Sequence, residues 1–596
     1  MSTISARSCI IVVVASLFAV QTAHSQWIEV VPGIEYAKFD APGPNEVFVT
    51  RMARDRADVT IDSTLSQGTL TGGAQTVSGM AGLYEQNIGF WDEVWGSRQE
   101  VVVAINGSFF DYPAAPRGGQ IQGGWYVLRY PEFGQSGFSW ALGRRAVMGE
   151  CVRHIPDRNF VRYPDGSTHR IDGINGDRVS PGLVLYTHHY DTATPPSQNA
   201  VEVLVRLPEP LLILPSPAYL AGIVVDIKPS GASTTIPFDH VVISAMGTVA
   251  TELQARVSVG DEVRFTQEVT ALTPDCSSHT SLDFTKSYGA VGGNIRFLRD
   301  GVIHSYSHNV GATTRHPRTA IASNDSFVFF FVVDGRRGGS VGMSATELGT
   351  FSRDQLGATE GVNLDGGGSS ALWVDGQIKN IPSDGSERAV ANGKVMVRML
   401  PMETQTGLLG GDPVAAPSGT QLRVGPGENF AAFHSVPAGA QGHAVDHHMA
   451  GVLATGRYWW KCSFGGATGW AAEDTLQFEP RDPEEPEDPE EPEDPEEPED
   501  PEEPEDPEQP EDPEEPEDPV DPADPEEPED PEQPEDPEDP EAPINPDPGY
   551  GGTVIGSCGC APVSGEGLLG LYLLLGAILL TSFRRGRRCI ALRGGD

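Results

Sequence analysis

The chain has 596 residues and a formal net charge of −45, and this charge is strongly localised. Between Asp482 and Glu541 there are 36 acidic residues and no basic one, so the rest of the chain carries only −9. Nucleic acid is an unfavourable partner for so acidic a chain, because like charges repel each other. The composition therefore argues against a nucleic-acid-binding protein.

The first 25 residues predict a secretory signal peptide. Arg7 supplies the positive charge, and Cys9–Val20 is an apolar stretch too short to span a bilayer. Residues 23–25 (Ala-His-Ser) place small side chains at the two positions that a signal peptidase reads, which predicts cleavage before Gln26. A buried first helix is the alternative. We expect an exported protein.

The seven cysteines fit export. Cys9 leaves with the signal peptide, and Cys151 could pair with Cys276 in an oxidising compartment, leaving Cys462 free. Three unpaired thiols remain the alternative. No CxxC or HExxH motif indicates zinc, and no metal or other cofactor is predicted. Oxygen ligands are abundant, so a structural calcium ion stays open.

Residues 26–402 predict one large globular unit of the α+β class, with a β-rich mixed sheet and few helices. Its short β-branched and aromatic runs read as strands. These runs are Val101–Ile105, Leu183–Tyr186, Val201–Val205, Val241–Ser244, Phe327–Val333 and Ala371–Val374. The run Phe327–Val333 is apolar on both faces, which predicts a central strand covered on both sides.

The best helix lies at Ala345–Leu356. Ser344 and Glu347 form a capping box at its start, and Gly357 follows at its end.

Residues 418–478 predict a small β-barrel, because short strands alternate with Gly and Pro turns. The order Leu422–Gly427, Tyr458–Cys462 and Gly469–Ala471 resembles a bacterial SH3-like domain. That resemblance implies binding of cell-wall peptide or glycan, and a spacer without a ligand is the alternative.

Residues 479–549 predict a disordered stalk. Proline recurs at every third position, and polyproline II has three residues per turn, so the prolines share one edge and the acids the other two. Like charges and proline together oppose helix and sheet. Calcium buffering by the carboxylates is the alternative.

Residues 558–588 predict a C-terminal sorting or transmembrane segment. The apolar stretch Gly567–Phe583 is just long enough to span a membrane, and the arginines of Arg584–Arg588 favour a cytoplasmic end. With Cys558-Gly559-Cys560 and the acidic stalk, the tail resembles a MYXO-CTERM-type sorting signal, which implies processing near the cysteines and retention at the cell surface. A permanent membrane anchor is the alternative.

Four polar clusters follow apolar runs or stand beside them, where strand ends could build a site. They are Asn106–Asp111, His316–Thr319, Asp334–Arg336 and Asn363–Ser370. The last cluster carries one carboxylate, three consecutive glycines and two hydroxyls. Each cluster alone is as well explained by a turn or a surface charge, so their joint occurrence is the signal.

The order of these clusters resembles the phosphodiester glycosidase family, over residues 26–402. Further matching positions are Leu183–Tyr186, Gly292-Gly293, Asn380-Ile381-Pro382 and Arg388, and an entry segment at Trp27 and Pro32–Tyr36. The resemblance implies hydrolysis of a sugar 1-phosphodiester, such as one of N-acetylglucosamine. Ser108 departs from the family's glycine, and the long stretch Tyr112–Asp172 is expected to reshape the cleft.

The resemblance implies a role for each residue. Asp365, Asp334, Arg318 and Arg336 are the predicted catalytic group, with the guanidinium forks binding phosphate oxygens. Asp365 would attack, activate water or stabilise an oxocarbenium-like centre. Asp334 would be a second carboxylate or would orient Arg336. Predicted substrate-binding residues are Asn106, Asp111, Asn363, Gly366, Gly367, Gly368, Ser369, Ser370, Asn380 and Arg388.

We therefore expect an exported, surface-attached glycosidase acting on a sugar 1-phosphodiester in a glycan or exopolysaccharide. One alternative is a non-catalytic protein that binds glycan or cell wall. The other is a metal-dependent phosphodiesterase using Asp365, Asp334 and Asp111, for which no histidine cluster at metal-ligand spacing is present.

Overall fold

The computed structural model describes residues 26–479 except 92–93, 112, 131–134, 232, 273–278, 282–283, 307–309, 402–406 and 450. The predicted signal peptide, stalk, C-terminal segment and the side chains of Cys151 and Cys276 lie outside the described residues. Within the described ones, no helix is both long and apolar enough to cross a membrane. Cys462 is buried and free, as expected.

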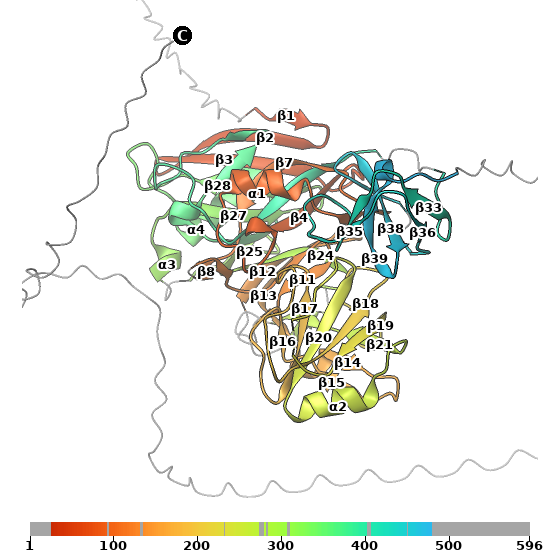
Figure 1. The fold of residues 1–596 in the computed structure, drawn as a ribbon. Helices are drawn as coiled ribbons and strands as arrows, with labels where there is room; N and C mark the ends of the chain where they lie inside the picture. Colours follow the sequence, from red (N-terminus) through yellow and green to blue (C-terminus); the bar gives the residue numbers. More distant parts are fainter. Residues whose placement is uncertain are drawn as a thin grey trace, which may run out of the picture. The chain divides into compact units, whose positions relative to one another are not determined.

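The first sheet has the strand order β1-β2-β3-β28-β27-β29-β25-β26 (Figure 1). Its strands are β1 (Ile28–Val31), β2 (Ile34–Ala41), β3 (Asn45–Ala53), β28 (Phe327–Val333), β27 (Arg318–Ser323), β29 (Glu360–Asn363), β25 (Ile295–Arg299) and β26 (Val302–Ile303). All pairings in this sheet are antiparallel. Strand β28 lies inside it, as its sequence predicts.

A five-stranded sheet of order β31-β30-β7-β32-β4 lies against the first sheet through a shared core. Its strands are β31 (Gln377–Ile378), β30 (Leu372–Val374), β7 (Gln99–Asn106), β32 (Asn392–Met399) and β4 (Val59–Leu65). A seven-stranded sheet, β11-β10-β24-β12-β13-β22-β23, contributes to the same core. Its strands are β11 (Trp125–Leu128), β10 (Gln120–Gln122), β24 (Ser287–Gly293), β12 (Gln135–Ala141), β13 (Ala146–His154), β22 (Val269–Leu272) and β23 (His279–Ser281).

A second eight-stranded sheet has the order β15-β14-β21-β19-β18-β20-β17-β16. Its strands are β15 (Thr168–Arg170), β14 (Phe160–Arg162), β21 (Glu262–Thr266), β19 (Leu220–Lys228), β18 (Val201–Arg206), β20 (His240–Met246), β17 (Gly182–Thr187) and β16 (Gly173–Ile174). Two short strands, β8 (Phe110–Asp111) and β9 (Ala115–Pro116), pair with each other. Every strand predicted from the sequence is observed, with ends shifted by at most a few residues.

Helices are few, as the α+β prediction requires. They are α1 (Val77–Tyr84), α2 (Thr248–Arg256), α3 (Val310–Thr313) and α4 (Ala345–Leu356), with 3-10 turns η1 (Ser66–Gly68), η2 (Pro156–Arg158), η3 (Gly367–Ser369) and η4 (Glu473–Thr475). Helix α4 has the predicted bounds. The Ser344 hydroxyl accepts from the Glu347 amide at 3.3 Å, the Glu347 carboxylate accepts in return, and Gly357 is left-handed at φ 63°.

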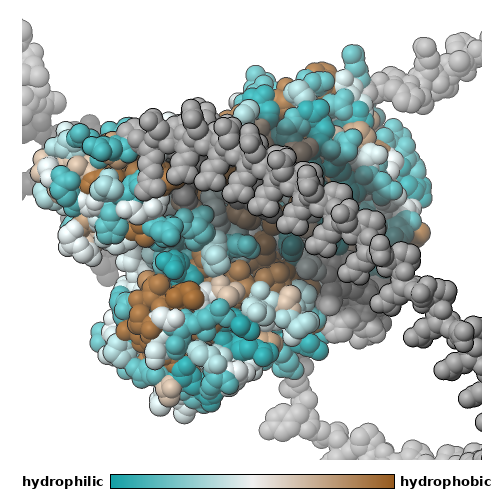
Figure 2. Space-filling view, turned by 90° about the vertical axis from the view of Figure 1, so that its right-hand side faces the viewer, coloured by the Kyte–Doolittle hydropathy of each residue, from teal (hydrophilic) through white to brown (hydrophobic). Residues whose placement is uncertain are grey.

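The alternation of side chains along β28 explains why both of its faces are apolar. Phe330 and Val332 pack into a core shared with the five- and seven-stranded sheets, whereas Phe329 and Phe331 pack into a core beneath α4. Successive strand residues point to opposite faces, so a strand covered on both sides needs apolar residues throughout. On the face shown in Figure 2, hydrophilic residues predominate and hydrophobic ones gather in a few patches.

Residues 413–475 form strands around a further core. These are β33 (Pro413–Ala416), β34 (Thr420–Arg423), β35 (Ala432–Val436), β36 (Ala440–Ala444), β37 (Val452–Ala454), β38 (Arg457–Phe464) and β39 (Ala467–Ala472). Strand β37 also pairs with β6 (Val94–Gly96), which pairs with β5 (Gly89–Trp91). The segment is therefore β-rich, as predicted, but its sheet continues into the N-terminal part. Its identity as an SH3-like domain stays a prediction.

A buried carboxylate joins this C-terminal β-rich segment to the rest of the described chain. Asp239 is 1% exposed and accepts from His240 Nδ1 at 2.7 Å, His447 Nε2 at 2.8 Å and Lys461 Nζ at 3.0 Å. Burial alone would raise the pKa of Asp239, but His240 and Lys461 hold that pKa well below its usual range. The ionised carboxylate is thus the partner of three groups from two segments.

We expect Asp239→Asn to lower the free energy of unfolding by about 3–5 kcal/mol, because it leaves Lys461 and two histidines without their buried anion. Chemical denaturation at neutral pH measures the effect. The matched control is Asp474→Asn, which removes the exposed partner of Arg457 and should cost at most about 1 kcal/mol. Equal effects of the two substitutions would contradict the buried clamp.

Candidate active site

Three of the predicted clusters meet at one turn. The Asp365 amide donates to the Gly107 carbonyl at 3.0 Å, the Leu364 amide to Thr319 at 2.9 Å, and the Gly367 amide to Pro317 at 2.9 Å. The turn therefore begins at the end of β29 and is held between the end of β7 and the start of β27. The end of β7 and the end of β29 are more than 200 residues apart in the sequence, so only the folded sheets bring them together.

Backbone constraints favour glycine at Gly366 and Gly367, and side-chain ends lie close to Gly367 and Gly368. A Cβ on Gly366 would be 2.6 Å from the Pro317 carbonyl oxygen, and one on Gly368 would be 2.1 Å from Arg388 Nη2. Gly367 has φ 65°, and a Cβ there would be 2.9 Å from Arg336 Nη2. The close approach expected at these glycines is thus made by the chain's own arginines and backbone.

Asp365 is the carboxylate of this turn. It is partly exposed, and its Oδ1 accepts from the Gly366 amide at 2.8 Å. Burial raises the pKa of Asp365, while hydrogen bonds from Ser369 and Gly366 and the charge of Arg388 oppose that rise. The carboxylate is therefore partly open to solvent and is influenced by the charge of Arg388, as suits a reacting group.

Arg336 is exposed and folds over the glycine turn. Its backbone is left-handed, at φ 61°, which is uncommon for a residue with a Cβ. Such strain is held only where the surroundings enforce it, and it gathers at functional sites. Its guanidinium makes no ion pair or hydrogen bond within the described part of the chain. The planar guanidinium group of Arg336 therefore remains available for an anion that enters beside Asp365.

Arg318, also predicted to grip phosphate, is used differently. Its Nε donates to the Met343 carbonyl at 2.8 Å, and one Nη donates to the carbonyls of Gly311 and Thr314 at 2.7 and 2.9 Å. It is 6% exposed, and burial lowers the pKa of its guanidinium to about 10. In this structure Arg318 supports the loop before β27 through these three carbonyls.

Asp334 is buried, 1% exposed, and both its oxygens have partners. Oδ2 accepts from Arg337 Nη2 at 2.7 Å, and Oδ1 accepts from Asn380 Nδ2 at 3.1 Å. The Ile381 amide also donates to Oδ2 at 3.0 Å. Burial raises the pKa of Asp334. The prediction that Asp334 orients Arg336 is wrong, since the arginine it binds is Arg337, and its role as a second catalytic carboxylate stays a prediction.

The three asparagines predicted to hold sugar hydroxyls are buried clamps. Asn106 is fully buried, and its amide donates to the Asp365 carbonyl at 2.8 Å while its oxygen accepts from Thr319 Oγ1 at 2.6 Å. Asn363 donates to Asn294 Oδ1 at 2.8 Å, and the Asn380 oxygen accepts from the Leu372 amide at 2.8 Å. The hydrogen bonds of these side chains hold the backbone around the site in place.

Arg388 and the two serines border the turn. Arg388 Nη2 pairs with Asp384 Oδ2 at 2.6 Å, and its Nη1 donates to Ser369 Oγ at 3.3 Å. Ser369 and Ser370 are both 1% exposed, and the Ser370 hydroxyl has no partner among the described residues. No histidine is hydrogen-bonded to either hydroxyl in the described part of the chain.

The hydrogen-bond partner of Asp111 does not belong to the glycine turn. It is exposed on β8, and its Oδ1 accepts from Arg117 Nε at 2.9 Å. Asp111, Asp334 and Asp365 thus each have different partners. Across the described residues, no group of three or more His, Cys, Asp or Glu side chains is placed to hold a metal ion. No observation therefore favours the metal-dependent alternative.

Sequence reasoning missed two charged neighbours of the site, Arg337 and Asp384, and the electrostatic surroundings of His316. Arg337 binds Asp334, Asp384 neutralises Arg388, and the pKa of His316 is lowered by burial and by the charges of Arg318 and Arg336. Spacing offered a signal for two of them, because Arg337 is three residues after Asp334 and Asp384 four before Arg388. The sequence did not show which of the two adjacent arginines, Arg336 or Arg337, binds Asp334.

Residues 220–397 match the family model described as phosphodiester glycosidase. The match includes Arg318, Asp334, Arg336, Asp365 and Arg388 but not Asn106, and it supports a relationship to that family over these residues. No protein with a curated description matches the chain.

Several solved structures are similar at low levels. A hypothetical protein from Synechocystis is 18% identical with a TM-score of 0.45, over 63% of this chain and 64% of that one, which is less than two thirds of its length. A putative exported protein from Burkholderia pseudomallei is 21% identical with a TM-score of 0.42, over 61% and 75%. The catalytic domain of zebrafish N-acetylglucosamine-1-phosphodiester alpha-N-acetylglucosaminidase, auto-inhibited by its pro-peptide, is 14% identical with a TM-score of 0.27, over 64% and 85%. With TM-scores under 0.5, these likenesses carry no functional argument.

We expect Gly367→Ala to impair the site beyond its effect on stability. A left-handed alanine costs about 1–2 kcal/mol, and its Cβ would also push Arg336 aside. Gly376→Ala is the matched control, because Gly376 is left-handed at φ 79° with nothing within 4 Å of its Cβ. Both variants should lose similar stability in denaturation. Only Gly367→Ala should lose binding or turnover of a phosphorylated ligand, and equal losses would remove the role of Arg336.

Proposed function

We propose that this chain is a phosphodiester glycosidase that hydrolyses a sugar 1-phosphodiester, of the N-acetylglucosamine-1-phosphodiester kind, in a glycan or exopolysaccharide. The observation that carries the proposal is Arg336. Its guanidinium is exposed and has no partner in the described chain. A left-handed backbone at Arg336 places that guanidinium over Gly367, which belongs to the turn that begins with Asp365. The family match over residues 220–397 supports the same reaction class.

The charges suit cleavage of the bond between C1 of the sugar and the phosphate oxygen. When that bond breaks, the phosphate leaves with the electron pair and C1 gains positive charge. Arg336 would bind the departing phosphate through two N–H groups, and Asp365 would face the positive centre. Water supplies the hydroxyl that replaces phosphate at C1, and its proton passes to Asp365 or to the released phosphate.

A strong proton donor is unnecessary in this scheme, because a phosphodiester leaving group is already a weak base. This fits a site in which Asp334 is buried between Arg337 and Asn380. Asp365 is then the one predicted carboxylate of the glycine turn that remains partly open to solvent. Its role differs from that of a paired acid and base, which most glycosidases need for poorer leaving groups.

Export and attachment to the cell surface are part of the proposal and rest on the sequence. The signal peptide at 1–25, the acidic stalk at 479–549 and the sorting-like tail at 558–588 support them. The C-terminal β-rich segment at 418–478 would bring the enzyme to wall peptide or glycan.

Incubation of the chain with N-acetylglucosamine 1-phosphodiesters tests the function. We expect release of free N-acetylglucosamine and of the phosphomonoester, and no release from the matching glycoside without phosphate. Asp365→Asn should abolish release, and Arg336→Gln should reduce kcat/KM by about 10²–10³-fold, as loss of one oxyanion-stabilising donor does. Arg315→Gln, an exposed arginine paired with Glu347, is the control.

A folded protein that releases no sugar from several such substrates would contradict the proposed function. If it still binds the glycan without turnover, the non-catalytic alternative replaces it.

The pH dependence of kcat/KM gives a second test. Asp365 must be ionised to act, so activity should fall as pH falls through its raised pKa. Arg388→Gln removes a positive charge that favours the ionised carboxylate, so the pKa of Asp365 rises and the acidic limb should move to higher pH. Arg353→Gln, whose arginine pairs with Asp354 on α4, should leave the limb unchanged. A downward shift with Arg388→Gln would contradict this assignment.

A further inference from the structure

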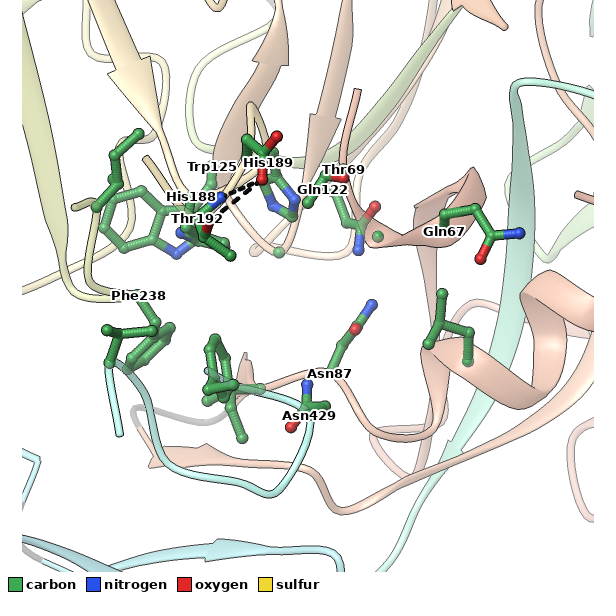
Figure 3. Close-up of a pocket in the computed structure, with 18 of the residues that line it drawn as sticks. Gln67, Thr69, Asn87, Gln122, Trp125, His188, His189, Thr192, Phe238 and Asn429 are labelled. Atoms are coloured by element: carbon green, nitrogen blue, oxygen red, sulfur yellow. Dashed lines mark hydrogen bonds between the residues drawn. The ribbon is translucent and has the colours of Figure 1, made fainter. Parts of the chain in front are cut away.

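A second cavity, of about 170 Å³, lies between the N-terminal part of the chain and the loop 424–431. Its walls come from the end of α1, the turn η1, the β10–β11 connection, residues 188–192 and that loop. Figure 3 shows Gln122 and Asn87 on opposite sides of the cavity, with their amide ends directed into the space between them. Since about 10–15 Å³ already holds one water, the volume admits a small molecule.

Gln122 is nearly closed to solvent, with 3% of its surface exposed, and Figure 3 shows its amide end directed into the cavity. Asn87, on the opposite side, is half-buried. An amide side chain offers both a donor and an acceptor, so these two groups can bond to an occupant of the cavity.

The two histidines act as neutral groups. Burial lowers the pKa of His189 to about 4 and that of His188 well below its usual range. The wall that these histidines form therefore carries no positive charge. The polar groups directed into the cavity in Figure 3 are the amides of Gln122 and Asn87.

The chemistry of the lining selects against anions. Among the described residues, no lysine or arginine lines the cavity, whereas Asp62 and Asp191 do. A hydroxyl both donates and accepts, so a ligand with several hydroxyls can bond to the donor and the acceptor of each amide. Phe238 and Phe430, with ring centroids 5.7 Å apart, line the same cavity and offer aromatic surface to the C–H face of a sugar ring.

We propose that this cavity is a binding site for a neutral polyhydroxylated ligand, a single uncharged saccharide unit, held between Gln122, Asn87 and the loop 424–431. The Phe238 amide donates to the Val424 carbonyl at 3.1 Å, which fixes that loop against the wall that carries His188. The ligand would therefore contact both the N-terminal part and the C-terminal β-rich segment.

The site is distinct from the turn at Asp365. Strand β7 begins where Gln99 donates to the Asn87 carbonyl, and it ends where Asn106 donates to the Asp365 carbonyl. At about 3.3 Å per residue, the strand separates Asn87 from Asp365 by roughly 20 Å. None of the residues predicted to act around Asp365 lines the cavity. The two sites also differ in charge, since an arginine fork faces one and none faces the other.

Saturation-transfer NMR on the full chain tests the proposal, with methyl α-D-glucopyranoside and N-acetyl-D-glucosamine as neutral probes and glucose 1-phosphate as the anionic one. We expect the neutral probes to bind at this cavity. Gln122→Leu, and separately the half-buried Asn87→Ala, should weaken their binding by about tenfold or more. Gln86→Leu, which changes an exposed amide beside Asn87, is the matched control and should bind as the wild type does.

Asp365→Asn separates this site from the proposed active site. Binding of the neutral probes should survive that substitution, and hydrolysis of the phosphodiester should survive Gln122→Leu. Melting temperature confirms that each variant folds. Three outcomes would overturn the proposal: no neutral probe binds the folded chain, which leaves water as the occupant; binding survives both cavity variants; or binding is lost in Asp365→Asn.

Discussion

The buried amide of Asn106 joins three parts of the chain that are far apart in sequence. It donates to the Asp365 carbonyl, and its oxygen accepts from Thr319 Oγ1 and from the Ala371 amide. These bonds hold the end of β7, the start of β27 and both sides of the glycine turn at one place. A fully buried amide that makes three such bonds is held rigidly, because any movement would leave a polar group unpaired. The position of Asp365 depends on this contact.

Four arginines lie around that fixed turn, and three of them already have hydrogen-bond or ion-pair partners. Arg318 is taken by three backbone carbonyls, Arg337 by Asp334, and Arg388 by Asp384. Arg336 alone among these four stays exposed without a described partner, on a backbone that a side chain rarely adopts. An exposed and unpaired guanidinium is free to bind an anion, so Arg336 together with Asp365 carries the proposed phosphodiester chemistry.

Two binding chemistries are thus separated along β7. One end holds a cationic fork and a carboxylate, suited to a sugar joined to phosphate. The other holds two neutral amides and aromatic side chains, suited to an uncharged sugar. The loop 424–431 closes the second site, and the Asp239 clamp fixes the segment that bears this loop through His447 and Lys461. A glycan that offers both kinds of unit could contact both sites of a single chain.

Local sequence determined the elements whose signal is local. The capping box at Ser344 and Glu347 set the bounds of α4, the apolar run of β28 required burial on both faces, and the consecutive glycines marked a close approach. Tertiary structure decided the partners. Arg337 rather than Arg336 binds Asp334, Arg318 turns toward carbonyls, and Gln122 faces a loop some 300 residues away. Several arginines lie within reach of each carboxylate, and only the packing of the sheets, which is set by contacts across hundreds of residues, selects among them.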